Sequence, residues 1–278
     1  MSTASEKTIH VLEQVVKGLP VGTNLALLHM FWTIITGSFL ASRGAIFPAL
    51  QRCGFGQEES YRSWQAMAQG TWGIGRLVKN WRGYVLGDGR WQANRYEGYR
   101  ALAIDITAFW RPRLQGWKGK FYHSIAGRAL KGVGFGLLVE IGQVDGHRIP
   151  LLKAILPAGA RCESQEAFKQ EVLWHAQRNL AEDEVAVHDA GASVADMQSQ
   201  KIPRFVLRLA KNCTARCNEL PGNQRGRRAE YGRIVRPVAR RHNGNRLAAT
   251  PADEATEVTY QGRTIIVQGW HGLVRRDQ

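Results

Sequence analysis

Apolar positions in the first third of the chain recur at helical spacing. The segment "IHVLEQVVKGL" (9–19) and the apolar window Leu25–Ala41 both place apolar residues three and four apart, which predicts helices. Residues 60–86 predict two short helices broken near Gly70–Gly75. We therefore expect residues 1–95 to form a helical domain. A helix-turn-helix at 60–86 would make it DNA-binding, whereas the plainer alternative is a helical hairpin with a solvated basic face.

From residue 99 the pattern changes to strands. "YRALAIDI" (99–106) is followed by "GFGLLVEIGQ" (134–143) and "HRIPLLKAIL" (147–156), and the last two predict a hairpin around "VDG". Ser164 is a candidate N-cap for a helix over 164–180. "EVAVHDAG" then predicts a strand, Ser193 opens a short helix, and "RFVLRLAKN" predicts a further strand. This order predicts an α/β fold with a mixed sheet over residues 96–212.

Residues 213–278 form a third, basic and β-rich region. "TEVTYQGRTIIVQGWHGLV" (256–274) predicts a hairpin that turns at Gln261-Gly262. Between residues 201 and 246 there are thirteen Lys and Arg against Glu219 and Glu230, a local charge of 13 − 2 = +11 out of the total of +15. Such an excess favours a polyanionic partner, usually nucleic acid.

Membrane and disulfide-stabilised classes are disfavoured. Leu25–Ala41 is short for a span and is interrupted by His29 and by hydroxyl residues, so we interpret it as a buried helix. The window also begins too deep in the chain for a signal peptide and lacks a Lys/Arg-rich n-region. The cysteines form no CxxC pair, which predicts reduced thiols in a cytoplasmic protein.

Two aspartates stand out against their strands. Asp105 follows the small apolar run 101–104 and is expected to be buried, where a charge needs a partner or a metal. Asp189 ends the apolar strand "VAVHDA". If the first and fourth strands are parallel neighbours, both carboxylates reach one edge of the sheet. A divalent cation such as Mg²⁺ would relieve their repulsion.

Here the chain resembles a known family. The segments "ALAIDITAF", "GFGLLVEIGQVDGHRIPLLKAILPA" and "VAVHDAGASVADM" resemble the DDE transposases of bacterial insertion sequences. The resemblance implies an RNase-H-like core (96–212), preceded by a helical DNA-binding domain (1–95) and followed by a basic β-rich insertion (213–278). It implies that Asp105 and Asp189 are catalytic and bind Mg²⁺ (or Mn²⁺) for DNA strand cleavage and strand transfer. The implied partners are the terminal repeats of the element and target DNA, with a homodimer on DNA in the bacterial cytoplasm.

One part of the family pattern is missing. The third acid, a Glu in Tyr-x-x-Arg-x-x-x-Glu, does not occur after Asp189, so we expect the amino-terminal part of a truncated transposase. Two alternatives remain open. The first is a non-catalytic DNA-binding remnant, and the second is a self-contained RNase-H-like nuclease whose third acid is Glu140 or Asp196.

Two basic segments are candidates for DNA contact. The long connection 108–133 mixes aromatic and basic residues, which suits stacking on unpaired bases and contact with phosphates. Its alternative is a β-hairpin whose aromatics, Trp110 among them, pack on the sheet. The second segment, 224–241, has a solvated face as its alternative. The candidate DNA-binding residues are Arg111, Arg113, Lys118, Lys120, Arg225, Arg227, Arg228, Arg236, Arg240 and Arg241.

Overall fold

The computed structural model describes residues 3–19, 26–42, 44–210, 212–222 and 230–274. It divides into two compact units, Met1–Val187 and His188–Gln278. The first contains helices and most of a mixed sheet, which confirms the predicted α/β class.

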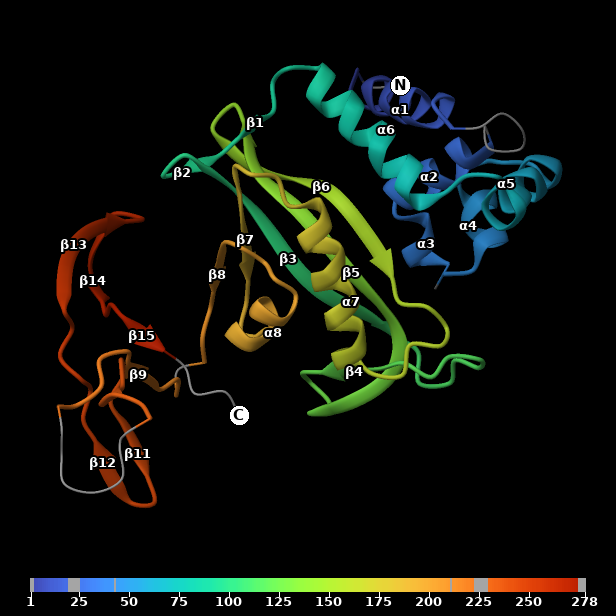
Figure 1. Ribbon diagram of the computed structural model, residues 1–278. Coiled ribbons are helices and arrows are strands. Elements are labelled where there is room, and N and C mark those ends of the chain that lie inside the picture. Colours follow the sequence, from blue (N-terminus) through green and yellow to red (C-terminus); the bar gives the residue numbers. More distant parts are fainter. Residues whose placement is uncertain (1–2, 20–25, 43, 211, 223–229, 275–278) are drawn as a thin grey trace. The chain divides into compact units, whose positions relative to one another are not determined.

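Helices fill the beginning of the first unit, as the apolar periodicity predicts. They are α1 (Thr3–Lys17), α2 (Leu27–Ile35), α3 (Ser38–Ala41), α4 (Ile46–Arg52), α5 (Gln57–Gln69) and α6 (Ile74–Gly87), which group together in Figure 1. Val16, Leu19, Leu27 and Ala66 form their buried core. The break between α5 and α6 falls at the predicted glycines.

The prediction of one buried helix over Leu25–Ala41 is wrong. Helix α2 ends at Ile35, and Gly37 takes a left-handed conformation (φ 73°) that separates it from α3. Ile35 and Leu40 are exposed. The glycine relieves the steric penalty of the left-handed turn, so the apolar window bends instead of continuing as a helix. Within the described part of the chain, no helix is both long and apolar enough to cross a membrane.

The sheet follows the helices. Its strands are β1 (Gln92–Ala93), β2 (Arg95–Tyr96), β3 (Tyr99–Trp110), β4 (Lys120–His123), β5 (Arg128–Val144), β6 (His147–Pro157), β7 (Glu184–His188) and β8 (Phe205–Leu207). The order is β1-β5-β3-β7-β8, with β6 and β4 also paired to β5 and β2 to β3. The predicted β5–β6 hairpin turns at Asp145-Gly146, both with positive φ. Half of the long connection 108–133 is strand, since β3 ends in it, β4 lies within it and β5 begins in it.

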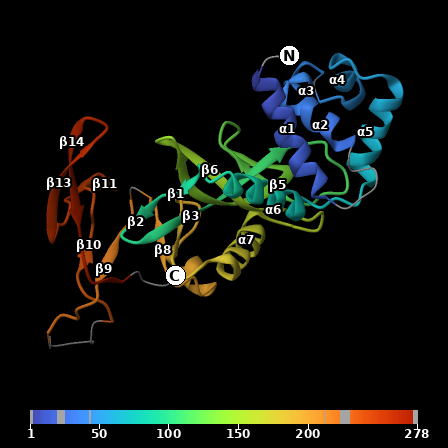
Figure 2. The ribbon, with the colours of Figure 1, turned by 90° about the horizontal axis from the view of Figure 1, so that it is seen from above.

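One face of this sheet is covered by α7 (Gln165–Asn179), which runs alongside β3 and β5 in Figures 1 and 2. Its predicted N-cap is confirmed, since the Ser164 hydroxyl accepts a hydrogen bond from the Ala167 N–H at 3.1 Å. A Cβ on Gly136 would lie 2.3 Å from Val172, so this glycine lets α7 approach the sheet closely. We call the side of β3 and β5 that carries Leu102, Ile104, Gly136 and Glu140 the helix face.

The second unit is mainly strands. The short helix predicted from Ser193 is α8 (Val194–Ser199), and Ser193 caps it. After it come the short strands β9 (Ala215–Cys217), β10 (Ile234–Val235), β11 (Arg240–His242), β12 (Asn245–Leu247) and β15 (Leu273–Val274). The predicted hairpin consists of β13 (Glu254–Tyr260) and β14 (Arg263–Gly269), turning at Gln261-Gly262. Strand β8 is shorter than "RFVLRLAKN" predicts.

Candidate functional site

Asp105 lies in the middle of β3 but is exposed, so the prediction of a buried carboxylate is wrong. Leu102 and Ile104 are buried on the helix face, and the alternation of the strand turns Asp105 to the other side. The Asp105 Oδ1 atom accepts a hydrogen bond from the Ile106 N–H at 2.8 Å. The prediction failed because a strand of small apolar residues has the same sequence pattern whether one face of it is buried or both are.

Asp189 is the residue after β7 and the second residue of the second unit. Its Oδ1 atom accepts a hydrogen bond from the Gly191 N–H at 2.8 Å and lies 3.1 Å from His188 Nδ1. The side chain is 68% exposed. The carboxylate thus shapes a tight turn and still faces solvent.

The predicted neighbour relation between the first and fourth strands is confirmed. Strands β3 and β7 are adjacent in the sheet. The Arg100 N–H donates to the Asp183 carbonyl at 2.8 Å, so the two strands begin at the same edge. Asp105 therefore stands on one of two adjacent strands, and Asp189 directly follows the other.

The donor chemistry of these two aspartates fits Mg²⁺ or Mn²⁺, which prefer carboxylate oxygens. The hydrogen bonds described above use Oδ1 of each residue and leave Oδ2 unengaged by any described protein donor. Among the described residues, however, no group of three His, Cys, Asp or Glu side chains is placed to hold a metal ion. Each aspartate by itself can therefore offer one carboxylate oxygen to a cation.

Glu140, the alternative third acid, is buried and surrounded by cations. Arg82 NH2 lies 2.9 Å from its Oε2, while Arg100 NH1 and Lys153 Nζ lie 3.3 Å and 3.8 Å from its Oε1. Glu140 pairs across the ladder with Leu102, and Asp105 lies three residues further along β3. The two carboxylates are thus on opposite faces of the sheet, and Glu140 is not placed to share a cation with Asp105.

A second buried acid, Glu184, extends this ion network. Both of its carboxylate oxygens lie 2.7 Å from Lys153 Nζ, and the Ala181 N–H donates to it at 2.8 Å. Burial raises the pKa of Glu184, but the hydrogen bonds from Ala181 and Lys153 outweigh it and hold the pKa below its usual value. Sequence reasoning missed this cluster because its members lie far apart in the chain.

Asp196, the other alternative third acid, caps a helix. Its Oδ2 atom accepts hydrogen bonds from the Ser193 N–H at 2.7 Å and from the Ser193 hydroxyl at 2.8 Å. These contacts form a capping box at the start of α8. The geometry assigns Asp196 a structural role.

Two lysines that face each other in the β4–β5 ladder lie on the Asp105 side of the sheet. Lys120 stands directly opposite Lys131 in the β4–β5 ladder. Leu137 is the ladder partner of Asp105, and Lys131 stands six positions before Leu137 on β5, so the two side chains point to the same side of the strand. Lys120 and Lys131 therefore face the same way as Asp105. We call this side of β3, β4 and β5 the Asp105 face.

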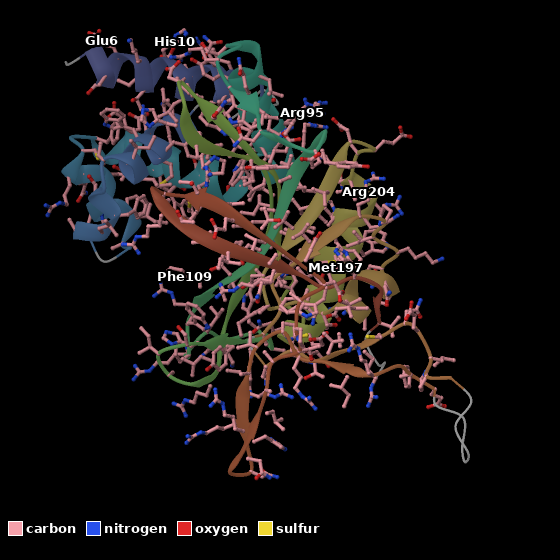
Figure 3. The ribbon with its side chains drawn as sticks, turned by 90° about the vertical axis from the view of Figure 1, so that its left-hand side faces the viewer. Glu6, His10, Arg95, Phe109, Met197 and Arg204 are labelled. Carbon is pink, nitrogen blue, oxygen red and sulfur yellow. The ribbon has the colours of Figure 1, made fainter. Side chains whose placement is uncertain are left out.

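Exposed aromatics accompany these lysines. Phe109 and Tyr122 are exposed, and Arg111 lies over the Phe109 ring at 4.7 Å (Phe109 is labelled in Figure 3). Arg113 is also exposed. Lys118 pairs with Glu163 at 3.3 Å on the surface.

Trp110 follows the alternative prediction of packing on the sheet. Its Nε1 donates to the Phe121 carbonyl at 3.1 Å, and its ring meets His123 edge-on. Sequence analysis did not select Lys131, because only the β4–β5 register shows that it stands opposite Lys120.

The basic candidates of the second unit separate into different roles. The Arg240 guanidinium holds a loop, donating to the Asn212 carbonyl and to the Thr214 hydroxyl. Arg236 is half-buried, and its Nε is buried without a described partner. Arg241 is exposed directly opposite Arg246 in the β11–β12 ladder, a second like-charge pair. Arg225, Arg227 and Arg228 lie outside the described residues.

The basic residues of α6 do not act as one surface. Arg82 is bonded to Glu140 and ties α6 to the sheet, while Val78 is buried. Arg76 and Lys79 are exposed. The helix therefore serves at least in part as a structural connection, a role for Arg82 that neither the helix-turn-helix nor the solvated basic face predicts.

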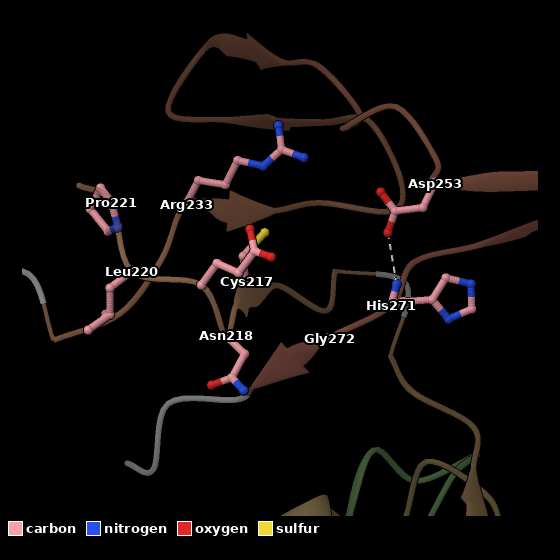
Figure 4. Close-up of a pocket in the computed structure, with 9 residues that line it drawn as sticks. Cys217, Asn218, Leu220, Pro221, Arg233, Asp253, His271 and Gly272 are labelled. Carbon is pink, nitrogen blue, oxygen red and sulfur yellow. Dashed lines mark hydrogen bonds between the residues drawn. The ribbon is translucent and has the colours of Figure 1, made fainter.

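The second unit also contains an open pocket of about 700 Å³ (Figure 4). Arg233 lines it, and its pKa is raised by a hydrogen bond to Cys217 and by the charges of Asp253 and Glu219. The His271 N–H donates to Asp253 Oδ2 at 2.8 Å across one side. Because its carboxylates balance its guanidinium, this pocket does not favour a phosphate.

Comparison of the chain with protein-family models and with curated proteins found no match.

Proposed function

We propose that this chain is a DDE-type transposase component with an RNase-H-like core, acting on DNA in the bacterial cytoplasm. The observation that carries the proposal is the Asp105 face, where an exposed acid shares one side of the sheet with Lys120, Lys131 and exposed aromatics. Like charges opposite each other in a ladder destabilise it by roughly 0.2–1 kcal/mol. Binding of a polyanion such as DNA would relieve that repulsion, so this surface favours DNA as a ligand.

In this proposal Asp105 and Asp189 are the residues that would hold Mg²⁺ or Mn²⁺. Such a cation supplies Lewis-acid activation of water and neutralises charge on a phosphodiester. The chain's own contribution is to fix each carboxylate by a backbone hydrogen bond while leaving one oxygen available. Basic side chains on the Asp105 face and Arg241 with Arg246 contact phosphates, for both the element ends and the target, and a homodimer forms on DNA.

A non-catalytic DNA-binding protein is the second candidate. It is favoured by the finding that, among the described residues, no third metal-ligating side chain joins an acidic pair. This candidate predicts the same DNA contacts without metal-dependent nicking. Its DNA affinity is unchanged by Asp105→Ala.

The DNA surface is tested by Lys131→Glu. The substitution converts the Lys120–Lys131 repulsion into an attraction, so we expect the free energy of unfolding to rise by about 0.5 kcal/mol. DNA affinity should fall, and the slope of log K against log salt should become shallower by about 1. The control is Arg178→Glu, which makes the same charge change on α7, on the opposite side of the sheet from the Asp105 face. Unchanged affinity for the Lys131 variant would remove this face from the DNA contact.

The metal site is tested separately by Mn²⁺ titration of the full chain and by a plasmid-nicking assay. Asp105→Asn and Asp189→Asn should each weaken Mn²⁺ binding, and any metal-dependent nicking should disappear with it. Asp145→Asn, in the exposed β5–β6 turn, is the matched control. Equal Mn²⁺ affinity in all four proteins refutes the metal site, whereas weakened Mn²⁺ binding without any nicking by the unmodified chain favours the non-catalytic candidate.

A further inference from the structure

The β13–β14 hairpin is a free-standing two-stranded sheet. No other strand among the described residues pairs with either of its edges. Its turn, Gln261-Gly262, has positive φ at both positions (49° and 72°), as in a type I′ turn that fixes the register of the two strands. A two-stranded hairpin alone is only marginally stable in water. It therefore gains most from a further strand.

The register shows which backbone groups point outward from β14. In a two-residue hairpin the residues beside the turn, Tyr260 and Arg263, form a hydrogen-bonded pair, and bonded and non-bonded pairs then alternate. The backbone N–H and C=O groups of Thr264, Ile266 and Gln268 consequently point away from β13. They form an unpaired edge ready to accept another strand.

The two edges of the hairpin differ in charge. Strand β13 carries Glu254 and Glu257, so two copies of β13 paired about their middle would bring Glu257 against Glu257. Strand β14 carries its one charge, Arg263, at its first residue and is uncharged from Thr264 to Gly269. Only β14 is complementary to itself. This complementarity identifies a second copy of the chain as the occupant.

We propose that two copies of the chain associate by antiparallel β14–β14 pairing centred on Ile266. Ile266 then forms a hydrogen-bonded pair with its counterpart, and Thr264 pairs with Gln268 of the other copy, so the outward-pointing groups of all three residues are satisfied. Ile265 and Val267 become cross-strand neighbours between the copies. Each half of the interface contributes the same residues, as a two-fold axis requires.

Side-chain exposure agrees with this partner. Ile266 is 65% exposed and Val267 50%, and Val258, Tyr260 and Ile265 are exposed as well. The register places Val258, Tyr260, Ile265 and Val267 on one side of the hairpin. Pairing of two hairpins makes a four-stranded sheet in which this apolar side is continuous. A sheet of three or more strands with a hydrophobic face can be stable by itself, whereas two strands cannot. The association needs no DNA, so it can be tested apart from the DNA-bound homodimer of the proposed function.

Ile266→Lys is the central test. Ile266 stands opposite Glu257 in the hairpin, so the lysine gains an attractive cross-strand partner and the hairpin itself is preserved. In the dimer, two lysines meet at the two-fold axis. Sedimentation equilibrium of the nuclease-treated full chain at high salt should show the unmodified protein dimerising with concentration. The variant should dimerise at least about tenfold more weakly.

Two further proteins make the result decisive. Thr259→Lys adds the same charge to the same side of the hairpin, but on β13, and should dimerise like the unmodified chain. Ile266→Glu, combined with Glu257→Lys so that the cross-strand pair stays attractive, should be monomeric alone, yet associate when mixed with Ile266→Lys, because opposite charges then meet at the axis. A monomeric unmodified chain overturns the proposal, and so does equal dimerisation of Ile266→Lys or failure of the two variants to complement each other.

Discussion

Glu140→Gln separates a structural from a catalytic role for a buried acid of the first unit. The Glu140 side chain is 4% exposed and faces Arg82, Arg100 and Lys153, whose side chains are 19%, 24% and 18% exposed. Removing one partner of a buried ion pair typically costs about 3–5 kcal/mol because the remaining charge stays desolvated. Since these cations keep some contact with water, we expect the lower end, about 3 kcal/mol.

The assay is urea denaturation followed by tryptophan fluorescence. With a slope of roughly 1–3 kcal/mol per molar urea, the midpoint of the first unit should fall by about 1 M or more. Glu58→Gln removes the same charge from the exposed pair with Arg62 and should change stability by less than about 0.5 kcal/mol. In the Glu140→Gln background, Arg82→Met should cost little, because its partner is already gone.

A Glu140→Gln protein as stable as the unmodified chain would refute this reasoning. If that stable protein had also lost metal-dependent nicking, Glu140 would be a catalytic acid and the self-contained nuclease would be favoured. The expected result leaves Glu140 as the centre of an ion network that joins α6 to the sheet.

Two further predictions concern acid stability and packing. The Asp183 pKa is lowered to about 2, first by the hydrogen bond from Arg100, and the Glu184 pKa is lowered as well. The stability that both acids contribute is therefore fully present above their unfolded pKa values near 4. It should be lost as the pH falls from about 4 towards 2, and Glu184→Gln should flatten the pH dependence of the urea midpoint there. Gly136→Ala should destabilise the first unit by about 1–3 kcal/mol because its Cβ would lie 2.3 Å from Val172. Gly83→Ala, in α6 with nothing within 4 Å, should instead stabilise it by about 0.5–1 kcal/mol, and equal urea midpoints for the two alanine variants would contradict the packing argument.

The ion network and the Asp105 face divide the two sides of the sheet between stability and proposed chemistry. The helix face buries Glu140 among cations supplied by α6, β3 and β6. The other side exposes Asp105 and sets Lys120 against Lys131. Charges on the helix face satisfy one another, whereas Lys120 and Lys131 on the Asp105 face repel each other. An anionic ligand on the Asp105 face would relieve that repulsion.

The sequence by itself determined the local elements, because their signals lie within a few residues. The turns at Asp145-Gly146 and Gln261-Gly262, the cap at Ser164 and the helix start at Ser193 were each predicted from the residues that form them. Such turns predict the hairpins that they close. The α/β class is predicted separately, because helical and strand periodicities alternate along the chain.

The tertiary structure alone decided which side of a strand is covered and which residues meet across it. Asp105 is exposed because α7 packs on the other side of β3, which the apolar run 101–104 does not reveal. Lys131 matters because the β4–β5 register puts it opposite Lys120. Glu140 meets Arg82 across 58 residues of chain. Such pairings depend on long-range register and packing, and local propensity carries no information about them.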